Sequence, residues 1–83
     1  MQRDSDWHDI FEVVVAHARD ILPELETHHF VPEDSLQELG ANSMDRADIV
    51  MSVMESLSMR GARAALVGPR NIGELVDLIH ASR

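Results

Sequence analysis

The pattern of apolar and polar positions along the chain predicts helices and no strands. In residues 6–22, apolar residues recur at intervals of three and four, which is the spacing of a helix with one buried face. Ser5 or Asp6 can cap the start of this helix. Pro23 ends it, because the residue before a proline is pushed out of the helical backbone conformation. The positions of the apolar face are Trp7, Ile10, Phe11, Val14, Ala18, Ile21 and Leu22.

Residues 23–42 show neither the helical nor the strand period and are expected to form a long connection. Leu36 and Leu39 predict one short helical turn within it, closed by Gly40. So long a connection in a small domain is unusual, and long loops of this kind are often functional. The apolar residues expected to anchor it on the core are Phe30 and Val31.

A second helix is predicted over residues 43–58, with Asn42 or Ser43 as its N-cap and Asp45 in its first turn. Its apolar residues cover more than half of the helix circumference, which is more than one buried face requires. One stripe, suited to a core by its defined rotamers, consists of Ile49, Val50, Val53 and Leu57. A neighbouring stripe consists of Met44, Ala47, Met51 and Met54.

The methionine stripe has two possible interpretations. Methionine is flexible and polarizable, so exposed methionines suit a contact surface that adapts to several partners. Asp48 and Glu55 lie beside the stripe and would favour basic partners. The alternative is that the methionines fill gaps in a small core. We expect the stripe to be exposed in part.

Beyond Gly61, the pattern predicts a short helix at 62–66 and a last helix at 72–81. Asn71 and Glu74 can form a capping box at the start of the last helix. The expected fold is therefore all-α, a single 83-residue domain with three main helices and one short helix. The apolar stripe of the last helix is Ile72, Leu75, Val76, Leu78 and Ile79.

Composition and charge exclude several classes of function. The net charge is −8, from fifteen acidic residues against seven arginines and no lysine, which disfavours binding to nucleic acid and anionic membranes. Without cysteine, the chain has no disulfide, thiol nucleophile or cysteine-based zinc site. It has no apolar run of transmembrane length and no signal peptide, so we expect a cytoplasmic protein. The stretch 56–73 has no acidic residue but contains Arg60, Arg63 and Arg70.

Ser43 stands at the predicted start of the second helix. The simplest interpretation of its hydroxyl is an N-cap. The alternative is covalent modification by a phosphate ester, which the free N–H groups and the dipole at a helix N-terminus would stabilise. Nucleophilic catalysis is disfavoured, because the G-x-S-x-G motif is absent and no histidine forms a triad signature with Ser43. The histidines also lack the spacing of a metal site.

The sequence LGANSM at 39–44, after a long loop, resembles the G-x-D-S-L region of acyl carrier proteins. The resemblance extends over nearly the whole chain and implies an acyl-carrier-like bundle. It also implies a 4′-phosphopantetheine group, derived from coenzyme A, attached to Ser43; the thiol of that group carries acyl groups as thioesters. Asn42 and Met44 replace the usual aspartate and leucine of the family, which could change the transferase that recognises the site.

Residues 40–55 and 60–79 are also similar to stand-alone carriers of polyketide β-branching cassettes. That similarity implies a malonyl group that is decarboxylated to acetyl and donated to an enzyme resembling 3-hydroxy-3-methylglutaryl (HMG) synthase. The implied partners are a phosphopantetheinyl transferase, an acyltransferase, a decarboxylating ketosynthase and that synthase-like enzyme. The chain itself would be a monomer without catalytic activity. The residues expected at the partner surface are Met44, Asp45, Arg46, Ala47, Asp48, Met51, Met54, Glu55, Arg60 and Arg63.

Two alternatives stay open at this point. The chain could be a generic stand-alone carrier of another polyketide or fatty-acid pathway. It could also be an unmodified helical adaptor that binds partners through its methionine stripe, with Ser43 as a simple cap.

Overall fold

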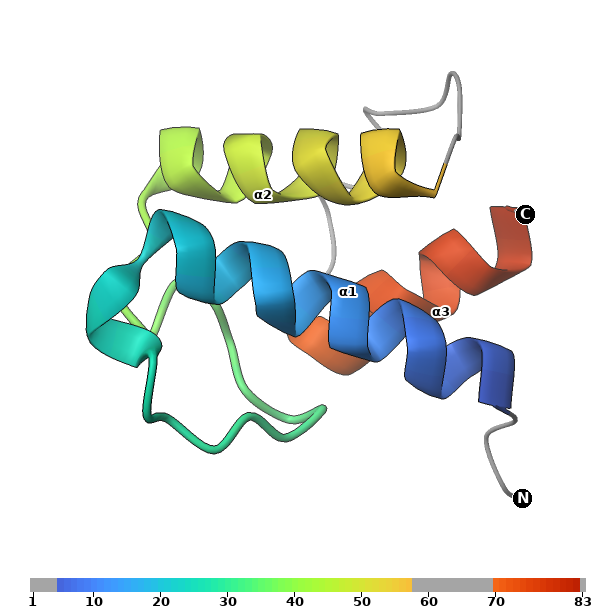
Figure 1. Cartoon of the computed structure of the whole chain (residues 1–83), viewed down its shortest axis with the longest axis horizontal. Coiled ribbons are helices and arrows are strands. Elements are labelled where there is room, and N and C mark those ends of the chain that lie inside the picture. The colour runs from blue at the N-terminus through green and yellow to red at the C-terminus, as the bar shows by residue number, and fades with distance from the viewer. Residues whose placement is uncertain (1–4, 58–69, 83) are drawn as a thin grey trace.

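The computed structural model describes residues 5–57 and 70–82, and these residues form three α-helices and one short 3₁₀ helix (Figure 1). The prediction of an all-α fold is confirmed, since no strand occurs in this part of the chain. Each α-helix begins and ends within two residues of its predicted bounds, whereas the predicted helix at 62–66 lies outside the described residues. The elements are α1 (Ser5–Ile21), η1 (Pro23–Leu25), α2 (Ser43–Ser56) and α3 (Ile72–Ser82).

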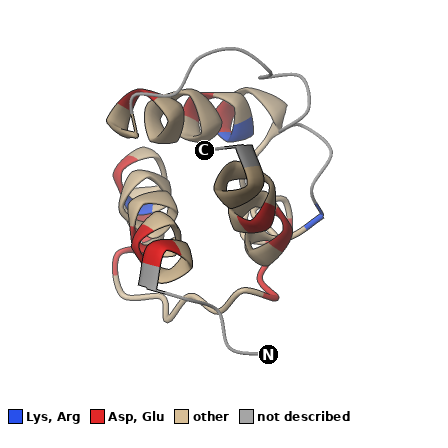
Figure 2. Cartoon of the chain, turned by 90° about the vertical axis from the view of Figure 1, so that its right-hand side faces the viewer, with Lys and Arg blue, Asp and Glu red and all other residues tan. Residues whose placement is uncertain are grey.

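The three α-helices surround one apolar core, with α1 packed against both α2 and α3 (Figure 2). The faces predicted from the helical spacing form this core. Two polar contacts also join the helices: Trp7 Nε1 donates to Asp77 Oδ1 at 2.6 Å, and His17 Nε2 lies 2.7 Å from Ser56 Oγ. The fully buried side chains with the largest volumes are Ile10, Val14, Ile49, Val53, Ile72, Val76 and Ile79.

Two apolar residues assigned to the core by pattern are exposed instead. Val31 was expected to anchor the loop together with Phe30, but only Phe30 is buried. Val31 begins a turn, in which the N–H of Asp34 donates to Val31 O at 3.0 Å, and its side chain lies outside the core. Leu78 lies at the edge of the apolar face of α3 and is also exposed. None of the helices within 5–57 and 70–82 is long and apolar enough to span a bilayer.

The loop between η1 and α2 ends in a helical turn closed by Gly40, as predicted. The N–H of Gly40 donates to Gln37 O at 3.2 Å, and the N–H of Ala41 donates to Leu36 O at 2.9 Å. These two bonds, with Gly40 at a φ of 109°, form a Schellman motif. Leu36 and Ala41 are both buried, so the turn is fixed on the core immediately before α2.

The middle of the same loop covers the N-terminus of α3. The N–H of Ile72 donates to Asp34 O at 2.9 Å, and the N–H of Gly73 donates to Pro32 O at 2.8 Å. A Cβ on Gly73 would lie 3.1 Å from both Pro32 Cβ and Pro32 O, so glycine permits this close approach. The loop therefore supplies acceptors for two N–H groups that a helix N-terminus leaves without partners.

The capping box predicted for α3 is present in altered form. Asn71 Oδ1 accepts a hydrogen bond from the Glu74 N–H at 2.8 Å, as expected. The Glu74 carboxylate accepts from the N–H of Arg70 at 3.0 Å, and not from that of Asn71. The bond to the Asn71 side chain is thus that of the standard motif, whereas the Glu74 carboxylate accepts from the residue before the N-cap.

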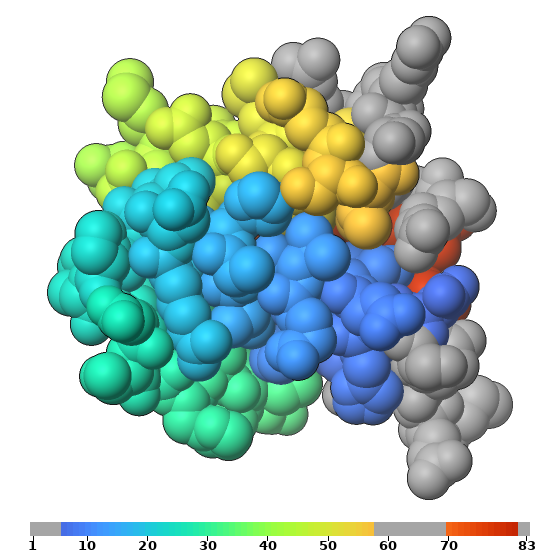
Figure 3. Space-filling view, in the orientation of Figure 1, coloured from blue at the N-terminus to red at the C-terminus, as the bar shows by residue number. Residues whose placement is uncertain are grey.

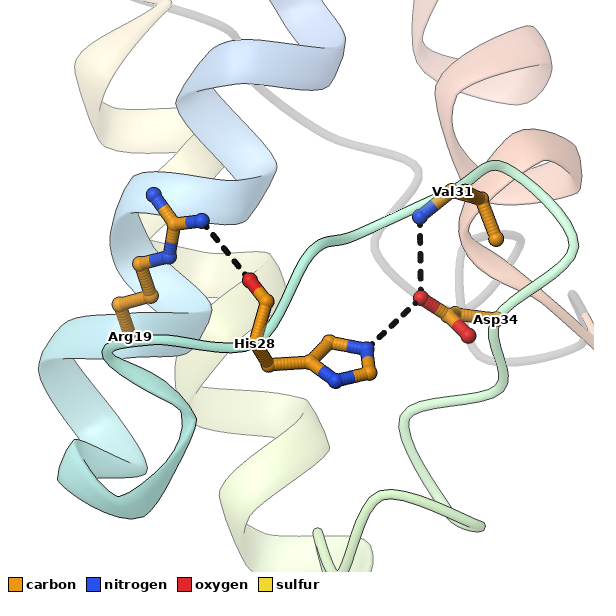
Figure 4. A network of polar contacts seen from close by, with 4 residues as sticks. All are labelled: Arg19, His28, Val31 and Asp34. Carbon is orange, nitrogen blue, oxygen red and sulfur yellow. Dashed lines mark hydrogen bonds and ion pairs between the residues drawn. The ribbon is translucent and has the colours of Figure 1, made fainter.

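A polar network holds the first half of the loop against α1 (Figure 4). Arg19 Nη2 donates to His28 O at 2.9 Å, and the Arg19 guanidinium lies 5.3 Å from the centre of the Phe30 ring. His28 Nε2 lies 3.0 Å from Asp34 Oδ2, which also accepts the N–H of Val31 at 2.9 Å. The loop is therefore ordered by specific contacts although it has little regular secondary structure.

This network changes the acidity of Asp34. Burial raises the pKa of its carboxyl group, but the hydrogen bonds from Val31 and His28 and the charges of His28 and His29 outweigh that effect. The pKa of Asp34 therefore lies below its ordinary value. A carboxyl group whose pKa is lowered by folding stabilises the protein above its unfolded-state pKa, and this stabilisation is lost as pH falls through the folded-state pKa.

We therefore expect Asp34→Asn to lower the free energy of unfolding by about 1 kcal/mol near neutral pH. The difference from wild type should shrink as pH falls below about 4, where Asp34 of the unfolded chain becomes protonated, and should vanish at the lower pH at which the folded carboxylate is protonated. Urea unfolding across this pH range measures the effect, and Glu33→Gln, at an exposed neighbouring acid, is the control. A constant difference at every pH would show that the charge of Asp34 does not stabilise the loop.

Candidate functional site

The first turn of α2 presents Ser43 to solvent. Ser43 is the first residue of the helix, its side chain is exposed, and its hydroxyl makes no hydrogen bond with any residue that the structure describes. Asn42 is the N-cap, because its Oδ1 accepts the N–H of Asp45 at 2.8 Å. Asp45 Oδ2 in turn accepts the N–H of Asn42 at 3.4 Å, which completes a capping box. The hydroxyl of Ser43 is therefore not needed as a cap.

The backbone that leads to Ser43 is held by Arg46. Arg46 Nη1 donates to Ala41 O at 3.1 Å, and the Arg46 N–H donates to Asn42 O at 2.9 Å. The sequence places Arg46 among the partner-surface residues, but its side chain is half-buried and contacts its own chain. Nothing in the local sequence signals this contact, because it joins a side chain to a backbone carbonyl five residues earlier.

The start of α2 is electrostatically suited to an anion. The first-turn N–H groups and the helix dipole give a partial positive charge at the N-terminus. Such a position stabilises a phosphate group, and a phosphate ester on the Ser43 side chain would lie beside it. The space-filling view shows the first turn of α2, in lime, at the molecular surface (Figure 3).

One face of α2 exposes part of the predicted methionine stripe. Met44 is 75% exposed and Met51 is 42% exposed, and Ala47 between them is exposed as well. We call these three residues the methionine surface. The acidic side chains that accompany it on the exposed side of the helix are Asp48 and Glu55.

The prediction that Met54 belongs to this exposed stripe is wrong, because Met54 is only 4% exposed. Met54 follows Val50 by four residues, and such pairs lie on the same side of a helix, so it extends the core face. For this methionine, the alternative of a gap-filling core residue is therefore correct. The two arginines expected at the partner surface, Arg60 and Arg63, lie outside the described residues.

The described residues contain no other group that suggests catalysis or metal binding. His17 contacts Ser56, and His28 contacts Asp34, so these histidines serve contacts elsewhere in the fold. No group of three or more histidine, aspartate or glutamate side chains in the described ranges could hold a metal ion.

Comparison with models of protein families gives no match. The chain is, however, 48% identical over 75 residues to the polyketide biosynthesis acyl-carrier protein AcpK of Bacillus subtilis strain 168, which covers 90% of this chain and 92% of that protein. It is also similar to a chain in the crystal structure of the HMG synthase of the curacin biosynthetic pathway in complex with an acetyl donor acyl carrier protein. That match has a TM-score of 0.87 and 44% identity, and covers 90% of this chain and 96% of the other.

The small helical fold of this chain is thus shared with a solved carrier-protein complex, and its sequence is similar to that of a polyketide acyl-carrier protein. The chain belongs to the acyl carrier proteins of polyketide biosynthesis. Members of this family are carriers and not enzymes, and the family implies a phosphopantetheine prosthetic group. The resemblance inferred from the LGANSM stretch is confirmed.

Proposed function

We propose that this carrier holds an acetyl group, formed from malonyl, on 4′-phosphopantetheine attached to Ser43. We further propose that it donates the acetyl group to an enzyme resembling HMG synthase, for addition at a β-keto carbon of a polyketide. The observation that carries this proposal is the likeness, at a TM-score of 0.87 and 44% identity, to a chain in the crystal structure of an HMG synthase in complex with an acetyl donor carrier protein.

The residues at the start of α2 fit the prosthetic group. Asn42 caps the helix, so the exposed hydroxyl of Ser43 remains available for a phosphodiester bond. The dipole and the N–H groups at this end of α2 would stabilise the phosphate. The group, when bound, supplies a thiol that holds acyl groups as thioesters. In this proposal the residues at the start of α2 fix the point of attachment and leave it accessible to partner enzymes.

The methionine surface is the proposed docking site for these enzymes. Exposed methionines adapt to different apolar surfaces, and Asp48 and Glu55 would attract partners with basic patches. The proposed partners are a phosphopantetheinyl transferase, an acyltransferase, a decarboxylating ketosynthase and the synthase-like enzyme. Because the carrier must leave each of them, we expect weak and rapidly reversible docking. Arg60 and Arg63 are proposed as elements of partner selectivity.

Acetyl transfer tests this function directly. The apo protein is loaded with acetyl-coenzyme A and a broadly active transferase, and then mixed with an HMG-synthase-like enzyme from a β-branching cassette. Intact mass measures the loss of acetyl from the carrier. We expect transfer at least about tenfold faster than from a fatty-acid carrier loaded in the same way, because the partner discriminates between the two docking surfaces.

The other outcomes identify the alternatives. Equal transfer rates from the two loaded carriers would indicate a generic carrier without donor specificity. Failure of the wild-type protein to gain any mass with a broadly active transferase would indicate an unmodified adaptor.

A further inference from the structure

We infer that Arg46 is a positioning residue for the modification of Ser43: its guanidinium holds the backbone before the serine and so fixes where the hydroxyl lies. This role goes beyond a contact with partner enzymes, which is what the sequence suggests for an arginine on α2. The inference rests on the proposed attachment of the prosthetic group at Ser43.

The first argument is the way in which Ala41 is held. Ala41 is buried. One of its backbone polar groups is bonded to the preceding turn and the other to the helix that follows. Its N–H donates to Leu36 O at 2.9 Å, within the turn closed by Gly40. Its carbonyl accepts Arg46 Nη1 at 3.1 Å, from the first turn of α2. Arg46 therefore connects the end of the loop to the helix that follows it.

The second argument is that Arg46 bonds two consecutive carbonyl groups. Its side chain donates to Ala41 O, and its backbone N–H donates to Asn42 O at 2.9 Å as the first bond of the helix, which any residue except proline would make. The side chain of Asn42 is occupied by Asp45. The backbone polar groups of the two residues before Ser43 are thus all engaged, so the position of the serine is set by a fixed backbone.

The third argument is electrostatic. Arg46 lies in the first turn of α2, where the helix dipole makes a cation unfavourable. A residue that opposes a local preference is expected where it serves another purpose. The half-buried guanidinium is directed at the loop carbonyl, so its charge strengthens that hydrogen bond.

Positioning matters because the Ser43 hydroxyl makes no bond of its own to the described chain. Its reaction requires a near-attack geometry at the transferase, and a displacement of about 1 Å can cost up to about 100-fold in rate. Loss of the Arg46 contact should therefore lower the turnover of the transferase on this carrier more than it weakens their binding.

The test compares Arg46→Met, which keeps an apolar stem but removes the donors, with Arg46→Lys, which keeps one donor. The kinetics of modification by coenzyme A and a transferase are measured together with amide hydrogen exchange at residues 41–43. For Arg46→Met we expect kcat to fall about tenfold and KM for the carrier to change less than about twofold. Exchange at 41–43 should accelerate, and Arg46→Lys should recover part of both losses.

Arg19→Met is the matched control, because it removes an equivalent bond from a guanidinium to a loop carbonyl, that of His28. It should leave kcat unchanged. An unchanged kcat in folded Arg46→Met would overturn the inference, as would a rise in KM alone with unchanged exchange, which would indicate direct contact with the transferase. If Arg46→Met does not fold, a folded Arg46→Lys with wild-type kcat despite faster exchange would overturn it equally.

Failure of the underlying function would look different. In that case the wild-type chain would gain no mass, or Ser43→Ala would still gain it. Neither result involves a difference between the Arg46 variants, so the two proposals can fail separately.

Discussion

Replacing Ser43 by alanine is expected to abolish the gain of one phosphopantetheinyl mass when the apo protein is incubated with coenzyme A and a transferase. No other residue of α2 combines an exposed hydroxyl with the N-terminal turn of the helix. The substitution should leave the fold intact, because Asn42 is the cap and the Ser43 hydroxyl bonds no described residue. Alanine also has a higher intrinsic helix propensity than serine.

The matched control is Ser52→Ala, on the same helix but half-buried, which should be modified like wild type. Intact mass measures modification, and far-UV circular dichroism with thermal unfolding measures the fold. A mass gain retained in Ser43→Ala would place the prosthetic group on another residue. A Ser43→Ala variant that unfolds would show that the hydroxyl has a structural role.

Replacing Ile49 by glutamate is expected to unfold the protein. Ile49 is 0% exposed, so the variant would bury an unpaired charge in the core. We expect a loss of more than about 4 kcal/mol in the free energy of unfolding. Domains of this size have only about 4–12 kcal/mol in total, so little folded protein should remain. Far-UV circular dichroism and urea unfolding measure this loss.

Met51→Glu is the matched variant, since it introduces the same charge two residues away on the exposed side of α2. Its helical content and its modification at Ser43 should be close to wild type, and its acetyl transfer to the synthase-like partner should be slower. Unfolding of Met51→Glu to the same extent as Ile49→Glu would place Met51 in the core and exclude it from a docking surface.

Much of the fold follows from local features of the sequence. Helical spacing placed the core faces of all three helices, and Gly40 marked the turn before α2. Exposure at the edges of these faces is decided by neighbouring elements, which periodicity does not describe. Met54 is covered by the rest of the core, whereas Leu78 at the edge of α3 is not. In the loop, Phe30 is buried and its neighbour Val31 is exposed, and the helical period does not describe either position.

Part of the candidate site can likewise be predicted from local sequence, and part depends on contacts that the sequence does not reveal. Ser43 was found because its turn, its helix and its motif are contiguous in the sequence. The cap could not be assigned between Asn42 and Ser43, since both residue types suit the position and only the geometry favours one. The contact of Arg46 with Ala41 was missed, because an arginine on a helix gives no sign of whether it points to solvent or to a carbonyl.

The close approach of the loop to α3 limits where this carrier can be recombined with others. Pro32 and Asp34 accept the first N–H groups of α3, and Gly73 leaves room for the proline ring. Residues 32–34 and 72–73 are distant in sequence, but their hydrogen bonds and close packing make each depend on the other. Chimeras that import the loop from a different carrier should therefore also import residues 71–74, with crossover points outside both segments.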